Sequence, residues 1–314
     1  MEKFDPDMDL SSLPRAKWWG DHDYVVQHGG FWYMPQFIKP INRVINHFNP
    51  LPSDVILATF PKTGTTWLKS IIYSILNRPS KHRLAVEHPH DLVPFLEVQI
   101  FAHSDEPPEL TAAPSGVRRI FGTHIPYQLL HETLDSCRSK VIYLTRNPKD
   151  TLISTWHFVN RRNNMRKTDQ PWSLENANDV FCRQVMPWGP YYDHVIGYRE
   201  LSLKRPENVM FVTYEEMMKD PHGYVKKLGD FLGCPFEGED EVEEVVKNCS
   251  IKVLGNHNVN KSEESPTWIP LPYNAFFRKG IVGDHKNYLS DEAIQRIDTL
   301  TKERFHSLGF MYGI

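Results

Sequence analysis

Short apolar runs alternate with helical patterns through the middle of the chain, between residues 50 and 220. An apolar run without polar interruption, bounded by turn residues, favours a buried strand. We predict four such strands, at Val55–Phe60, Arg119–Thr123, Lys140–Arg146 and Val209–Thr213. Trp67–Leu76 has a helical pattern, and Asn147 and Pro148 suit the N-cap and the first turn of another helix. Strands separated by helices predict an α/β fold, a single domain with a central parallel sheet flanked by helices.

The flanking parts of the chain are less regular. Residues 1–50 are rich in aromatic side chains without a regular pattern, and we expect them to pack as an irregular segment on the domain formed by residues 51–314. The basic stretch 160–170 favours a solvated loop over an anion-binding patch. The stretch 255–274 contains three prolines and little periodicity, which is typical of a lid or a binding loop.

Candidate functional residues follow each predicted strand. The loop Pro61–Thr66 follows the first strand, His124 follows the second, Arg146 closes the third, and Tyr214 comes just after the fourth. Ligands of parallel α/β sheets bind outside the carboxyl ends of the strands. We therefore expect these four elements to meet along one edge of the sheet and to form the functional site.

The loop after the first strand has the composition of an anion-binding site. It contains Lys62, Gly64 and three threonines, and it leads directly into a helix. The first backbone N–H groups of a helix have no partner within it, and together with the helix dipole they can hold a phosphate. The order of residues differs from the nucleotide-binding pattern G-x-x-x-x-G-K-[ST], because Lys62 precedes Gly64. An ordinary turn between a strand and a helix is the alternative.

Two further basic elements could hold a second anion. Arg146 ends a strand where nucleoside triphosphatases place a magnesium-binding aspartate, and an arginine can grip a phosphate with two hydrogen bonds. Ser154 follows about two helical turns later. The segment Arg278-Lys279-Gly280 joins two cations to a glycine that permits close backbone approach. A surface salt bridge, an ordinary helix serine and an exposed turn are the respective alternatives.

Composition limits the class of protein. With 40% hydrophobic residues, 24% charged residues and a net charge of −3, the 314-residue chain is typical of a globular protein and argues against broad nucleic-acid binding. Its four cysteines form no C-x-x-C pair and lack zinc-binding spacing, which predicts reduced thiols. The polar N-terminus does not resemble a signal peptide, and no apolar run approaches the ~20 residues that span a bilayer. We therefore expect a cytoplasmic protein without a membrane or nucleic-acid partner.

Three motifs, in this order and at this spacing, resemble those of the cytosolic sulfotransferase family: FPKTGTTW at 60–67, LTRNPKDTLIS at 144–154 and RKGIVGDHK at 278–286. GFWY at 30–33 and HPHDLVPFLE at 88–97 are similar to its plant branch. The resemblance implies a P-loop-like phosphosulfate-binding loop, the donor 3′-phosphoadenosine 5′-phosphosulfate, the product adenosine 3′,5′-bisphosphate and no metal. It also implies transfer of the sulfonate to a hydroxyl of a small aromatic or steroid-like acceptor, such as a flavonoid, another phenolic or a brassinosteroid.

The resemblance further implies roles for individual residues. His124, in the sequence T-H-I-P, would be the general base, and Lys62 would stabilise the charge on the leaving phosphate. The loop would hold the 5′ end of the donor, and the other two basic elements would hold its 3′-phosphate. The implied donor-binding residues are Lys62, Thr63, Gly64, Thr65, Thr66, Trp67, Arg146, Ser154, Tyr214, Arg278, Lys279 and Gly280. The implied acceptor-binding residues are Phe31, Phe95 and Phe158.

The chain also departs from the pattern of this family. Ile251 stands where relatives often carry a phenylalanine beside the adenine, and His285 replaces the tryptophan of the G-D-W-K element. Asp291 replaces an apolar residue of the family's dimer motif, so we expect a monomer or a weak homodimer. Gly122 provides no charge where some relatives carry a lysine two residues before the base. A nucleotide kinase-like phosphotransferase and a non-catalytic protein that binds the phosphonucleotide or a phenolic ligand are the alternative functions.

Overall fold

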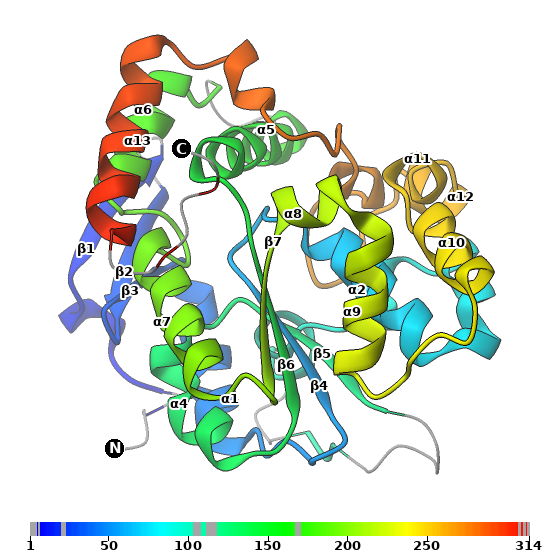
Figure 1. Ribbon diagram of the computed structural model, residues 1–314. Helices are drawn as coiled ribbons and strands as arrows, with labels where there is room; N and C mark the ends of the chain where they lie inside the picture. The colour runs from blue at the N-terminus through cyan, green and yellow to red at the C-terminus, as the bar shows by residue number, and fades with distance from the viewer. Residues whose placement is uncertain are drawn as a thin grey trace.

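A parallel sheet lies at the centre of the computed structural model (Figure 1). The structure describes residues 5, 7–19, 23–102, 108–110, 118–166, 171–306, 309 and 312, without the side chains of 163–166. The strand order is β5-β4-β6-β7, and every neighbouring pair is parallel. The strands are β4 (Val55–Thr59), β5 (Ile120–Thr123), β6 (Lys140–Thr145) and β7 (Val209–Thr213). The four predicted strands and the α/β class are confirmed.

Helices cover both faces of this sheet, so that β4 is buried along its whole length. Because successive side chains of a strand point to opposite faces, Ile56 and Ala58 join one hydrophobic core, and Val55 and Leu57 join the other. The helices α1 (Ile38–His47), α4 (Tyr127–Ser136) and α7 (Tyr191–Lys204) contribute to the first core. The helices α2 (Thr65–Leu76), α9 (Pro221–Phe231) and α10 (Glu239–Asn248) contribute to the second.

The N-terminal segment is more regular than its sequence predicts. It forms an antiparallel sheet of β1 (Arg15–Trp19), β2 (Asp23–His28) and β3 (Phe31–Tyr33). Val25, Val26 and Tyr33 are fully buried in the first core, so the sheet packs on the domain. The prediction of an irregular segment is wrong. The adjacent buried pair Val25–Val26 interrupts the alternation that would have indicated a strand.

The remaining elements connect these layers or extend them at the carboxyl edge of the sheet (Figure 1). They are η1 (Leu10–Ser12), η2 (Pro35–Phe37), η3 (Arg78–Ala85), α3 (Pro89–Leu92), η4 (Leu96–Ile100), α5 (Pro148–Arg166), α6 (Leu174–Cys182), α8 (Tyr214–Lys219), α11 (Ile251–Leu254), α12 (Asn258–Lys261), η5 (Tyr273–Phe276), η6 (Asp284–Asn287) and α13 (Asp291–Phe305). As expected, Asn147 caps α5 by accepting a hydrogen bond from the backbone N–H of Lys149 at 3.0 Å.

The two predicted surface stretches differ in outcome. Helix α5 continues to Arg166, so a loop at residues 160–166 is wrong, while residues 167–170 lie outside the described part of the chain. Tertiary contacts extend this helix, because the Asn160 side chain accepts a hydrogen bond from the Trp172 N–H at 2.7 Å and Arg162 pairs with Asp23 at 3.1 Å. The stretch 255–274 has little regular structure apart from α12, and its residues 268–271 line the cavity described below.

Two expectations drawn from composition bear on the structure as a whole. All four cysteines are free thiols, as predicted. In the described part of the chain, none of the helices has the length and apolar character needed to cross a bilayer.

Candidate functional site

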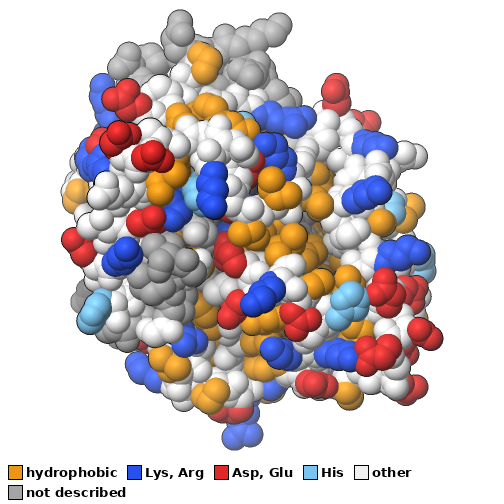
Figure 2. Space-filling view, turned by 45° about the horizontal axis from the view of Figure 1, so that its top comes forward, with side chains coloured by type: hydrophobic (Ala, Val, Ile, Leu, Met, Phe, Trp, Pro, Cys, Tyr) orange, Lys and Arg blue, Asp and Glu red, His pale blue; other side chains and the backbone are white. Residues whose placement is uncertain are grey.

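A cavity of about 960 Å³ lies where the four parallel strands end. Lys62 from the loop after β4, His124 after β5, Arg146 after β6 and Tyr214 after β7 all line it. The predicted meeting of these residues at one edge of the sheet is therefore confirmed. On the face shown in Figure 2, hydrophobic side chains gather near the middle with Lys and Arg side chains beside them. The site thus combines an apolar wall with positive charge.

The loop after β4 depends on the conformation of Gly64, the N-cap of α2. Its φ of 113° is left-handed, and a Cβ at this position would lie 2.7 Å from Cδ2 of Tyr214. The loop consequently packs tightly against the start of α8 and presents Thr65, Thr66 and Trp67 to the cavity. The unpaired N–H groups and the dipole of α2 make this end of the helix suited to an anion.

Thr63 does not present its hydroxyl to the cavity. The side chain is fully buried, and its Oγ1 lies 2.8 Å from the carbonyl oxygen of Phe60 and 3.1 Å from that of Leu144. Its hydroxyl donates to these carbonyls and fastens the loop to β6, so a donor-binding role for this side chain is not supported. The predicted role of Lys62, Gly64, Thr65, Thr66 and Trp67 agrees with their positions in the cavity wall.

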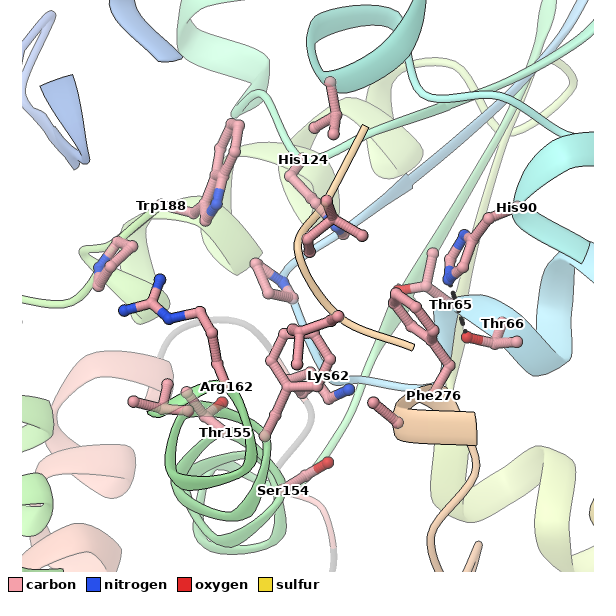
Figure 3. A pocket seen from close by; sticks show the side chains of 18 of the residues that line it. Lys62, Thr65, Thr66, His90, His124, Ser154, Thr155, Arg162, Trp188 and Phe276 are labelled. Carbon is pink, nitrogen blue, oxygen red and sulfur yellow. Dashed lines mark hydrogen bonds between the residues drawn. The ribbon is translucent and has the colours of Figure 1, made fainter. Parts of the chain in front are cut away.

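Lys62 extends into the cavity between α5 and the segment that contains Phe276 (Figure 3). Its Nζ lies 3.7 Å from the ring centroid of Phe158 and 5.6 Å from that of Phe276, which are cation–π distances. Burial lowers the pKa of Lys62 to about 7, and the positive charges of Arg278 and Arg146 lower it further in the same direction. Near neutral pH this amine can therefore gain a proton when an anion enters the cavity.

Arg146 provides a second cation at the end of β6. One of its Nη atoms donates to the carbonyl of Ile281 at 2.7 Å, and the guanidinium carbon lies 4.5 Å from the ring centroid of Tyr214. Asp150 is 3.4 Å from the same Nη. The Nε atom of Arg146 is buried and has no hydrogen-bond partner among the described residues. A buried, incompletely paired guanidinium in a cavity wall fits the recognition of a phosphate.

The third basic element is held beside Arg146 by buried carboxylates. Asp150 accepts hydrogen bonds from the backbone N–H of Gly283 at 2.7 Å and of His285 at 2.9 Å, which fixes the loop onto α5. Arg278 and Gly280 line the cavity. Lys279 does not line it, because its Nζ donates to Asp284 at 2.9 Å on the outer side of the loop. The position of this side chain therefore gives no support to the predicted donor-binding role of Lys279.

His124 lines the cavity, and one of its ring nitrogens is held by a hydrogen bond. Its Nδ1 is 2.7 Å from the carbonyl oxygen of Thr59, which can only accept, so Nδ1 carries the proton and Nε2 carries the lone pair. Glu97 accepts a hydrogen bond from the backbone N–H of His124 at 2.7 Å. Burial lowers the pKa of His124 to about 3, although the hydrogen bond to Thr59 favours the charged form. The imidazole is therefore neutral at pH 7 and can accept a proton at Nε2.

The apolar wall around His124 is mostly aromatic. The ring centroids of Phe95 and Trp188 lie 4.6 Å and 5.5 Å from that of His124, and Phe158 from α5 also lines the cavity. Phe31 is not part of this wall, because it is buried in the N-terminal sheet, edge-on to His194. The remaining aromatic wall residues that the sequence did not single out include Trp18, Phe37, Trp268, Phe276 and Phe277. No motif marks them, since they come from segments far apart in the chain.

The departures from the family pattern have structural explanations. Ile251 lines the cavity and packs so closely against Gly280 that a Cβ on the glycine would lie 2.5 Å from Cδ1 of the isoleucine. His285 is buried, and its Nδ1 is 2.8 Å from Asp150, so it braces the loop that carries Arg278. Among the described residues, no group of three or more His, Cys, Asp or Glu side chains could hold a metal ion.

Comparison with known proteins gives the same answer from sequence and from fold. The Sulfotransferase domain family matches residues 52–309. Cytosolic sulfotransferase 15 of Arabidopsis thaliana is 40% identical over 318 residues, which cover 97% of this chain and 86% of the relative. A solved Arabidopsis thaliana structure, provisionally named a steroid sulphotransferase, has 32% identity and a TM-score of 0.73, covering 96% of this chain and 93% of the other.

A retinol dehydratase, solved with androsterone and the inactive cofactor PAP, has the same fold at a TM-score of 0.75 and 18% identity, covering 96% of this chain and 93% of the other. The arginine at the end of β6, in place of a magnesium-binding aspartate, disagrees with a kinase-like phosphotransferase. The family match and the extent of the identity lead to one conclusion: the chain is a sulfotransferase and belongs to the cytosolic sulfotransferase family.

Proposed function

We propose that this enzyme transfers the sulfonate of 3′-phosphoadenosine 5′-phosphosulfate to a hydroxyl group of a small aromatic or steroid-like acceptor, with His124 as the general base. One observation carries the proposal. Nδ1 of His124 is locked to the Thr59 carbonyl, so Nε2 is a proton acceptor in the same cavity that holds two separate cations, Lys62 and Arg146. The donor has anionic groups at both ends of its ribose, which matches two separate cation groups.

Each residue has a defined part in this reaction. The donor supplies the sulfonate, and the loop Lys62–Trp67 and the start of α2 hold its 5′ end, while Arg146, Ser154 and Arg278 hold its 3′-phosphate. His124 takes the proton of the acceptor hydroxyl at Nε2 as the oxygen bonds to sulfur. Lys62 neutralises the negative charge that develops on the 5′-phosphate oxygen as the sulfur–oxygen bond breaks. Fixed donor anions near His124 favour its protonated form, which offsets the effect of burial on its pKa.

The acceptor class follows from the wall around His124. Phe95, Trp188, Phe158 and Phe276 enclose this part of the cavity, and such a wall suits a flat or polycyclic apolar compound. The retinol dehydratase of the same fold holds androsterone together with PAP, which is adenosine 3′,5′-bisphosphate, and this supports the same pairing of ligands here.

The name of the Arabidopsis relative supports a location in the cytosol. Asp291 begins helix α13 instead of offering an apolar contact, which supports a monomer or a weak homodimer.

The replacement His124→Ala tests the role of the base. We expect turnover to fall by about 10²–10⁴-fold, the usual contribution of general base catalysis, with unchanged affinity for adenosine 3′,5′-bisphosphate. Turnover is measured as bisphosphate release with flavonols, brassinosteroid-like sterols, hydroxylated fatty acids and desulfo-glucosides, and affinity by titration calorimetry. His131→Ala is the matched control, since His131 lies on α4 outside the cavity wall. Near-normal turnover of His124→Ala would remove this residue from its role.

A further inference from the structure

His90 is a buried histidine in the cavity wall that the mechanism above does not use. Its Nε2 lies 3.1 Å from Oγ1 of Thr66, the second residue of helix α2 (Figure 3). The other ring nitrogen, Nδ1, is buried and has no hydrogen-bond partner among the described residues. The side chain is 2% exposed. A polar ring at this position needs an explanation, because buried polar groups without partners destabilise the fold.

The ring of His90 has little freedom to turn. Phe95 stacks on it at 5.1 Å with an interplanar angle of 29°, and Phe276 and Trp268 meet it at 4.6 Å and 5.6 Å. Its backbone is also held, because the N–H of His90 donates to Nδ1 of His88 at 3.1 Å. Burial is the largest cause that holds the pKa of His90 well below its usual range. The ring is therefore a fixed, neutral imidazole that presents Nε2 to Thr66.

A neutral imidazole has one N–H, and its position decides what Thr66 can do. If Nδ1 carries the proton, Nε2 accepts a hydrogen bond from the Thr66 hydroxyl, and this hydroxyl can then not donate to a ligand. The buried Nδ1–H has no acceptor in this arrangement. If Nε2 carries the proton, it donates to Oγ1, and the hydroxyl proton of Thr66 is free to point into the cavity. An anion offers only acceptors, so the Thr66 hydroxyl can donate to an anion at the end of α2 only in the second arrangement.

We propose that His90 is a positioning residue of the donor site, whose Nε2–H donates to Oγ1 of Thr66 and so directs the Thr66 hydroxyl proton to the 5′ anion of the phosphonucleotide. This inference rests on the proposed function, in which the start of α2 holds that anion. The chain Nε2–H···Oγ1–H···O⁻ strengthens each of its bonds by polarising the next one. Because Phe95 and Phe276 fix the ring and also form the acceptor wall, the same aromatic cluster orders both ligand sites.

A double-mutant cycle with His90→Phe and Thr66→Val tests the proposal. The phenylalanine keeps the aromatic packing and removes the N–H, and the valine keeps the branched shape and removes the hydroxyl. We expect His90→Phe to weaken the binding of adenosine 3′,5′-bisphosphate by about three- to tenfold, the size of one hydrogen bond. In the Thr66→Val background the same replacement should change the dissociation constant by less than about twofold. An equal loss in both backgrounds, or no loss in the single variant, would overturn the proposal.

A conservative variant of His90 distinguishes a role of its N–H in positioning Thr66 from a role of its ring in packing. His90→Gln can place an amide N–H near the position of Nε2, so its affinity should lie nearer to the wild type than to His90→Phe. Steady-state kinetics should show a raised KM for the donor and an unchanged KM for the acceptor in His90→Phe. An equal loss of bisphosphate affinity in the Gln and Phe variants would contradict the assignment. A change confined to the KM for the acceptor would contradict it as well.

A measurement on the wild-type enzyme covers the case in which His90→Phe does not fold. Nitrogen-15 NMR of the imidazole rings, with adenosine 3′,5′-bisphosphate bound, reports which nitrogen of His90 carries the proton. We expect the Nε2–H tautomer, and an Nδ1–H tautomer in the complex would refute the proposal. The wild-type titration itself checks the underlying function, because a protein that does not bind the bisphosphate would refute the donor site as a whole.

Discussion

Proton uptake by Lys62 on donor binding is the most direct consequence of the electrostatics of the cavity. In the free enzyme, Nζ of Lys62 rests 3.7 Å from the ring of Phe158, and its pKa is about 7. Above this pH the amine is mostly neutral and contributes little to the attraction of an anion. A bound 5′-phosphate or phosphosulfate favours the charged form, so binding draws a proton from the buffer.

The size of the effect follows from that pKa. At pH 8 a group with a pKa of about 7 is roughly nine-tenths neutral, so full protonation in the complex takes up about 0.9 proton. Charging the amine at this pH costs about 1.4 kcal/mol, which corresponds to an affinity about tenfold below that of the fully charged enzyme. Phosphate groups have a second pKa near 6, so at pH 8 the ligand itself contributes little to the uptake.

Titration calorimetry at pH 8, in two buffers with different ionisation enthalpies, measures the uptake directly. The replacement Lys62→Met should abolish it and weaken binding, while Lys226→Gln, which alters an exposed lysine of α9, should leave both unchanged. Affinity of the wild type should fall as pH rises from 7 to 8. No net proton uptake by the wild type at pH 8, or equal uptake in Lys62→Met, would refute the reasoning.

Three further predictions concern the frame of the site. A Cβ added by Gly122→Ala would lie 2.8 Å from Cε of Lys69. We therefore expect the free energy of unfolding to fall by about 1–3 kcal/mol, and an unchanged midpoint of urea unfolding would contradict this. Arg146→Gln should abolish the preference for adenosine 3′,5′-bisphosphate over adenosine 5′-monophosphate, measured by calorimetry; a preserved preference would place the 3′-phosphate elsewhere. Burial raises the pKa of Asp150, but the hydrogen bond from His285 and the charge of Arg146 outweigh it and lower that pKa to about 2. Asp150→Asn should therefore cost about 2 kcal/mol of stability at pH 7, and thermal unfolding should show this deficit shrinking as the pH falls from about 4 to about 2.

The central sheet could be predicted because its strands are buried on both faces. Such strands appear in the sequence as continuous apolar runs, and β4 is an example in which every residue is buried. The parallel arrangement then places the ends of all strands at one edge, which is why His124, Arg146 and Tyr214 could be assigned to one site before the structure was known. Local sequence was sufficient here because each of these residues directly follows a strand.

Elements that depend on distant contacts could not be predicted in the same way. Helix α5 extends past Asn160 because that side chain and Arg162 find partners in Trp172 and Asp23, which are separated from them in sequence. Phe31 was expected in the acceptor wall, but its strand pairs with β2 and directs the ring into the core against His194. Such outcomes follow from tertiary packing, which overrides local preference.

Gly122 shows how a residue-by-residue comparison can misjudge a site. The absence of a lysine two positions before His124 suggests a missing cation, yet the structure places the side chain of Lys69, from α2, in the space that a side chain at position 122 would need. Nζ of Lys69 donates to the carbonyl of Val93 at 2.6 Å and lies 3.3 Å from the ring centroid of Phe95. Burial holds the pKa of Lys69 well below its usual range, so this amine fills space and supports Phe95 without supplying a full charge to His124. The positive charge of the site therefore comes from Lys62, Arg146 and Arg278. The glycine is required by packing, because a side chain at position 122 would collide with Lys69 and Phe95.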